Sequence, residues 1–176
     1  LAAAGSPALA QESFTPARAS AYAEVEQLPD WTGIWYPDWA ALFSGRAAAR
    51  PVLTPTAQVA YDAYQESIRA NGPNQKAQCR PTGIPGVMKQ PYTIEFLFSP
   101  GRVTILTEAY EQVRRIYTDG RALPSVEELD LFYNGTSVGY WEGDTLVIDT
   151  VGLQPRTSIA AGIPHTEASR VHEHIW

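Results

Sequence analysis

Apolar and polar residues alternate most regularly in the middle of the chain, where they predict three β-strands. The alternation runs over residues 92–99, stops at Pro100-Gly101, and resumes over residues 102–110. A third alternating run covers residues 112–118. Adjacent proline and glycine mark a tight turn, and strands of this length joined by short turns are typical of an antiparallel meander. The rest of the chain is expected to add strands to this sheet.

Two further regions favour strands. Residues 137–141 and 145–151 flank Gly143-Asp144, a pair that suits a tight hairpin turn. Residues 167–176 alternate once more and predict a last strand. Its positions divide into Val171, Glu173 and Ile175 on one face, and Arg170, His172, His174 and Trp176 on the other.

One stretch has the period of a helix. Between residues 55 and 70, apolar residues recur at spacings of three and four. Thr54 stands where an N-cap is expected, and Pro55 suits the first helical position. The predicted fold class is therefore mainly β: an antiparallel meander curled into a lipocalin-like barrel or half-barrel, with this one helix covering it. An open α+β sheet is the alternative.

Composition indicates a globular protein. The chain has 176 residues, of which 44% are hydrophobic and 18% charged, enough for one domain with a core. The net charge of -6 gives no support to nucleic-acid binding, and no apolar run approaches the roughly 20 residues of a membrane span. A single cysteine, Cys79, rules out an internal disulfide.

The N-terminal sequence LAAAGSPALAQES is typical of the end of a secretory signal peptide. Its apolar stretch finishes at Ala8-Leu9-Ala10, a small-x-small cleavage site. We therefore expect residues 1–10 to be a signal-peptide remnant and the protein to be periplasmic or secreted. Residues 11–27 are expected to be a loose lead-in, and residues 28–176 a single β-rich domain that lacks C-terminal residues.

Gly33-Ile34-Trp35 resembles the G-x-W pattern that opens the first strand of lipocalins and other calycins. The resemblance covers three residues within a β-rich context. It implies a tryptophan that packs across one end of a barrel, usually against an arginine from a late strand.

Four longer motifs resemble a family of secreted bacterial proteins without an established activity. They are CRPTGIPGVM, EFLFSPGRVTILTEAYEQVRRIYTDGR, VGYWEGDTLVIDTVGL and GIPHTEASRVHE, and they fall between residues 79 and 173. The resemblance implies a periplasmic or secreted protein and transfers no catalytic residue.

Three histidines, His165, His172 and His174, fall within ten residues. On a strand, His172 and His174 share one face with their side chains about 6–7 Å apart. With His165 from a nearby loop they form a candidate zinc or copper site. The alternative is a set of two exposed strand residues and a loop residue.

Polar residues within the meander are candidates for acid–base chemistry. Arg114 and Arg115 are adjacent, so their side chains must point to opposite faces of a strand. If the sheet closes, Glu95 or Glu108 can join Arg114 and Tyr117 in a buried cluster. Such a cluster would shift the pKa values of its carboxylates and suit them to acid–base chemistry. The candidate catalytic residues are Glu95, Arg114, Tyr117 and His165. Ion pairs on the outer face are the alternative.

Aromatic residues make up 11% of the chain, and the mouth of a barrel commonly forms an apolar pocket. The candidate ligand-binding residues are Trp35, Trp39, Phe96, Tyr140 and Trp141. The predicted function is a binding protein for a small apolar or aromatic ligand. The alternatives are an enzyme without an organic cofactor, using acid–base or metal-assisted chemistry on a small molecule, and a subunit of an envelope assembly. Whether the chain forms an oligomer is left open.

Overall fold

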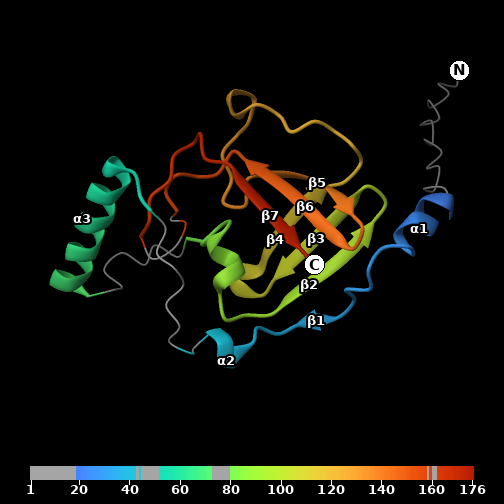
Figure 1. Cartoon of the computed structure of the whole chain (residues 1–176), viewed down its shortest axis with the longest axis horizontal. Helices are drawn as coiled ribbons and strands as arrows, with labels where there is room; N and C mark the ends of the chain where they lie inside the picture. The colour runs from blue at the N-terminus through green and yellow to red at the C-terminus, as the bar shows by residue number, and fades with distance from the viewer. Residues whose placement is uncertain (1–18, 43, 45–51, 73–79, 158, 160–161) are drawn as a thin grey trace, which may run out of the picture.

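The computed structural model describes residues 19–42, 44, 52–72, 80–157, 159 and 162–176. Within them, one sheet of seven strands follows the order of the chain from β1 to β7 (Figure 1). The strands are β1 (Ile34–Trp35), β2 (Ile94–Ser99), β3 (Arg102–Thr107), β4 (Gln112–Tyr117), β5 (Thr136–Glu142), β6 (Thr145–Val151) and β7 (Val171–Ile175). The sheet curls into a half-barrel, which confirms the predicted mainly β fold class.

The predicted meander and second hairpin are both present. β2, β3 and β4 pair antiparallel in register, as do β5, β6 and β7. The two halves meet differently from a simple meander, because β4 and β5 run parallel and only Ile116 with Ser137 and Tyr117 with Val138 lie opposite each other. The parallel pairing requires the long connection between Tyr117 and Thr136 to return to the end of the sheet at which β4 begins, so that β5 can run in the same direction as β4.

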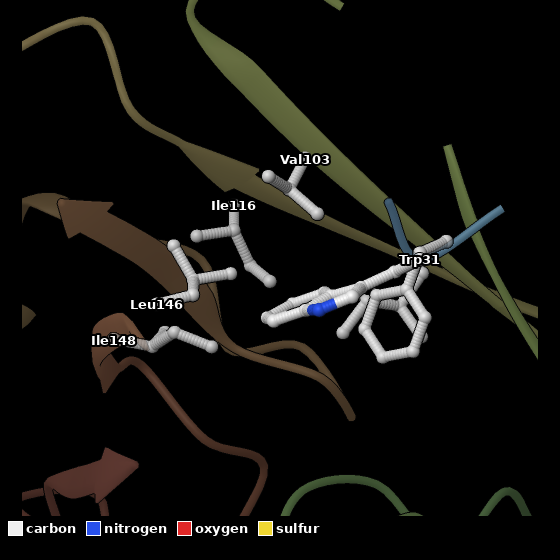
Figure 2. Close-up of a cluster of buried hydrophobic side chains, with 7 residues drawn as sticks. Trp31, Val103, Ile116, Leu146 and Ile148 are labelled. Atoms are coloured by element: carbon white, nitrogen blue, oxygen red, sulfur yellow. The ribbon is translucent and has the colours of Figure 1, made fainter. Parts of the chain in front are cut away.

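One face of the sheet carries the core. The register aligns Phe96, Ile105 and Arg114 across β2, β3 and β4, so alternate residues of neighbouring strands share this inner face. The buried cluster on it contains Trp31, Phe96, Val103, Ile105, Ile116, Leu146 and Ile148. Figure 2 shows Trp31 reaching into this cluster alongside the side chains from the strands.

The helices lie in the segments before the sheet and in the connections between its strands. They are α1 (Ala19–Val25), α2 (Trp39–Leu42) and α3 (Pro55–Asn71), with 3-10 helices η1 (Gly86–Lys89), η2 (Ala109–Glu111) and η3 (Val126–Glu128). α1 falls within the segment expected to be a loose lead-in, and it contacts β2.

The helix predicted between residues 55 and 70 is α3, and its N-terminal cap is as expected. The side chain of Thr54 accepts a hydrogen bond from the Ala57 amide at 3.3 Å. Its expected role as a cover for the sheet is not seen, because α3 has no buried residue and stands to one side of the sheet (Figure 1). Its apolar stripe is built largely from alanine and tyrosine, and the Tyr64 ring lies against Gly162.

The tryptophan that packs into the barrel end is Trp31 rather than Trp35. Trp31 is 8% exposed and its ring centroid lies 5.1 Å from that of Phe96 and 5.2 Å from that of Trp141. Trp35 is the second and last residue of β1 and is 47% exposed, and its Nε1 donates to the Trp31 carbonyl at 2.9 Å. β1 is only two residues long and lies at the sheet edge, so its side chains do not reach the core.

Replacement of Trp31 by alanine is expected to destabilise the protein by about 3–5 kcal/mol, because it empties a large site in the main core. Trp35→Ala is the matched control and is expected to cost at most about 1.5 kcal/mol, the loss of one hydrogen bond and partial contact. Chemical denaturation of both variants measures the difference. Equal losses from the two tryptophans would contradict this assignment of the core.

Candidate functional site

A cavity of about 450 Å³ opens beside the first half of β4. We call it the β4 pocket. It exists because β5 begins only at Thr136 and leaves the start of β4 without a strand neighbour on that side. Its lining consists of Pro81, Gln112, Val113, Arg114, Arg115, Tyr117, Phe132, Tyr133, Asn134, Gly135, Thr136 and Ser137.

Close backbone contacts hold the two loops of this pocket together. The Ile84 amide donates to the Tyr133 carbonyl at 3.1 Å, and a Cβ on Gly83 would collide with that same carbonyl. Ile84 is itself buried with Leu153 in a second apolar cluster. The wall formed by residues 81–84 and 132–135 is therefore anchored on both sides.

Three buried polar atoms at or beside the pocket have no hydrogen-bond partner among the described residues: Thr82 Oγ1, Gln112 Oε1 and Asn134 Oδ1. The nitrogen of each amide is engaged, since Gln112 Nε2 donates to the Ala109 carbonyl at 3.3 Å and Asn134 Nδ2 to the Val113 carbonyl at 3.5 Å. Buried acceptors without partners cost free energy. Gln112 and Asn134 line the pocket, so a bound molecule that brings N–H or O–H donors would pair with these two oxygens if the amides turn toward it.

The charged side chains of the β4 pocket are arginines. Arg114 and Arg115 line it, and none of the ion pairs among the described residues involves Arg115. An adjoining cavity of about 320 Å³ shares Gln112 and Val113 but is lined by three carboxylates, Glu95, Glu108 and Glu111. The two cavities therefore differ in charge, and the β4 pocket is the one suited to a negatively charged group.

Arg114 lies in a buried polar network on the inner face. Its side chain is 4% exposed, and its guanidinium forms a bidentate ion pair with Glu173 of β7, with Nη1 3.1 Å from Oε1. Nη2 also donates to Thr150 Oγ1 of β6 at 2.8 Å, and Nε to Ser137 Oγ of β5 at 3.3 Å. The prediction that Arg114 and Arg115 face opposite sides is confirmed, since Arg115 is exposed.

The other candidate catalytic residues do not join Arg114. Glu95 precedes Phe96 on β2, and Phe96 points to the inner face. The side chain of Glu95 therefore lies on the opposite face, in register with Ile34 and Leu106. Tyr117 shares that outer face, where the Arg121 guanidinium stacks 3.8 Å from its ring centroid. The predicted cluster fails because Tyr117 is three positions from Arg114 on the same strand, and because Glu95 is aligned across the sheet with Leu106 and Val113 rather than with Arg114.

The three histidines are divided into a pair and a single residue. His172 and His174 project from the outer face of β7, with their Nε2 atoms 3.0 Å apart. His165 lies in the connection before β7, with Nε2 2.8 Å from Thr157 Oγ1 and Nδ1 3.3 Å from the Thr166 carbonyl. Among the described residues, no group of three or more His, Cys, Asp and Glu side chains is arranged to hold a metal ion. The predicted three-histidine set is thus reduced to a pair.

Asp149 of β6 supports the histidine pair. Its carboxylate accepts from Arg170 Nε at 3.0 Å and from His172 Nδ1 at 3.0 Å. The hydrogen bond from Arg170 lowers the pKa of the Asp149 carboxyl below its ordinary value, and the bond from His172 adds to the effect. Asp149 therefore stays ionised to lower pH than a free aspartate.

The predicted ligand-binding aromatics do not line the β4 pocket. Phe96 and Trp141 are part of the core around Trp31. Trp35, Trp39 and Tyr140 are exposed, each by about half. The aromatic residues of the pocket are instead Tyr117, Phe132 and Tyr133.

Two polar lining residues with unpaired oxygens, Gln112 and Asn134, were not among the site residues predicted from the sequence. Gln112 begins a strand as a polar residue on the apolar face, which was a usable signal. Asn134 sits before Gly135 and looks like an ordinary turn residue, so its amide beside β4 had no signature. Glu173 was also detectable, because it occupies an inward position between Val171 and Ile175.

Removal of Glu173 is expected to destabilise the fold strongly. Glu173→Leu leaves the buried Arg114 guanidinium without its charge partner, at a cost of about 3–5 kcal/mol. The double variant Arg114→Met, Glu173→Leu removes both charges and is expected to recover most of that loss. Denaturation midpoints of the two variants provide the measurement, with the exposed-pair variant Asp119→Asn as a control that changes little. A double variant no more stable than the single would contradict the network.

No protein-family model, curated protein or solved structure matches this chain. The resemblance to secreted bacterial proteins therefore stays a prediction. In the part of the chain that the structure describes, no helix combines the length and apolar character needed to cross a membrane.

Proposed function

We propose that this protein is a binding module for a small aromatic or apolar ligand, held in the β4 pocket. The observation that carries the proposal is the set of orphaned buried acceptors, Gln112 Oε1 and Asn134 Oδ1, beside an aromatic-lined cavity. Pockets for small molecules are typically apolar with a few polar groups that fix orientation.

The pocket chemistry narrows the class of ligand. Phe132 and Tyr133 offer ring surfaces, and the free carbonyl oxygens of Gln112 and Asn134 require hydrogen-bond donors on the ligand. Arg115, exposed and without an ion pair among the described residues, favours a carboxylate or another anion. An aromatic acid that also carries an amino or hydroxyl group meets all three requirements.

The packed core makes the interior of the half-barrel a poorer ligand site than the β4 pocket. Trp31 and the side chains around it fill the inner face, with aromatic centroids 5.1 to 5.9 Å apart. A ligand there would have to displace packed side chains. The β4 pocket needs no such displacement.

The aminobenzoate isomers are suitable probes, since each has a ring, a donor and a carboxylate. Titration of isotope-labelled protein is expected to shift the backbone amide signals of Gln112, Tyr133 and Asn134 selectively. Asn134→Leu is expected to weaken binding of both aminobenzoate and aniline, because a buried acceptor is lost. Shifts centred instead on residues 22–32 and 96–98, which line a separate cleft, would contradict the proposal, as would no binding at all.

A second variant tests the anionic group. Arg115→Gln is expected to weaken aminobenzoate binding by about tenfold through loss of a charge-assisted hydrogen bond, while the affinity for aniline stays unchanged. Arg102→Gln, an exposed arginine of β3 outside the pocket, is the matched control. Equal effects from the two arginine variants would show only a general charge effect and would remove Arg115 from the site.

We further propose that the module works in the periplasm or outside the cell. The small-x-small pattern ending at Ala10 supports this. When the precursor is expressed in a bacterium with an outer membrane, the mature protein is expected in the periplasmic fraction with Gln11 as its first residue. N-terminal sequencing checks this, and a cytoplasmic product that retains residues 1–10 would contradict it.

A further inference from the structure

The outer face of β7 carries a pair of histidines that point at each other. His172 and His174 are two positions apart on one strand, so their side chains share a face. Their ring centroids are 4.9 Å apart and their Nε2 atoms 3.0 Å apart. Both side chains are exposed, so a solute can reach the two nitrogens.

Asp149 fixes which nitrogen of His172 is free. The Nδ1 of His172 is 3.0 Å from Asp149 Oδ1, and an ionised carboxylate only accepts hydrogen bonds. Nδ1 must therefore carry the proton, and the Nε2 of neutral His172 has a lone pair directed at His174. A carboxylate that holds the far nitrogen of an imidazole is the usual support for a metal-ligating histidine.

We propose that His172 and His174 form a two-nitrogen chelate for a late first-row divalent cation, Cu²⁺ or Zn²⁺, with Asp149 as the positioning residue. Two nitrogens that bind one metal at distances of about 2.0–2.1 Å lie roughly 2.9–3.4 Å apart. This range covers nitrogen–metal–nitrogen angles from square-planar to tetrahedral coordination. The Nε2 atoms meet this requirement at 3.0 Å. Water completes the coordination shell, since no third His, Cys, Asp or Glu ligand joins the pair among the described residues.

The same contact without a metal is a hydrogen bond between the rings, with His174 Nε2 as donor and His172 Nε2 as acceptor. Metal binding requires His174 to take its other tautomer, with the proton on Nδ1. This costs little at an exposed imidazole. Imidazole nitrogens suit copper, nickel and zinc, and affinity is expected to be higher for Cu²⁺ than for Zn²⁺.

The test uses untagged protein in a Cys79→Ser background, which removes the thiol as a competing ligand. Isothermal titration with Zn²⁺ and electron paramagnetic resonance with Cu²⁺ are expected to show one ion per chain and two coordinating imidazole nitrogens. His174→Gln is expected to weaken binding at least tenfold and leave one coordinating nitrogen. Asp149→Asn is expected to weaken it by about tenfold with both nitrogens retained.

His165→Gln is the matched control, because it removes one histidine without touching the pair. It is expected to leave affinity and spectrum unchanged. The proposal is overturned if His174→Gln binds as tightly as the parent, if His165→Gln weakens binding as much, or if neither ion binds at about 1 mM. The affected side chains are exposed, so the variants are expected to fold, and circular dichroism verifies this.

Discussion

The buried guanidinium of Arg114 imposes the main constraint on this structure. A cation that is 4% exposed must find partners, because an unpaired buried charge is too costly to keep. The partners come from Ser137, Thr150 and Glu173, one on each of the next three strands. β4 and β5 share only two opposed residue pairs, so side-chain bonds from Arg114 add to a weak backbone junction. The two halves of the sheet are joined at this point.

The β4 pocket is a consequence of that junction. Because β5 joins β4 only near its end, the Val113 carbonyl faces no strand and accepts instead from Asn134. Arg114 and Ser137 belong both to the buried network and to the pocket lining. One wall of the pocket is thus held by the same hydrogen bonds that join the two halves of the sheet. A preorganised wall lowers the entropic cost of binding a ligand.

Local patterns in the sequence predicted most of the fold. The two-residue period located β2 to β7, and Thr54 with Pro55 located the start of α3, because these signals depend only on neighbouring residues. The prediction that Trp35 packs against the core was wrong, and Trp31 does so instead. Both tryptophans stand in the same short segment, and only the length of β1 decides which one reaches the core. The parallel pairing of β4 and β5 depends on a long connection, which local periodicity does not encode. The pocket was missed for the same reason, as its residues come from three separate segments.

β7 shows how one alternating strand serves two different environments. Glu173 points inward to Arg114, while His172 and His174 point outward beside Asp149. Neutralising the inward carboxylate disturbs the core, whereas changes to the outward imidazoles leave the core contacts intact. The two faces can therefore be altered independently by mutation, even though their residues are adjacent in sequence.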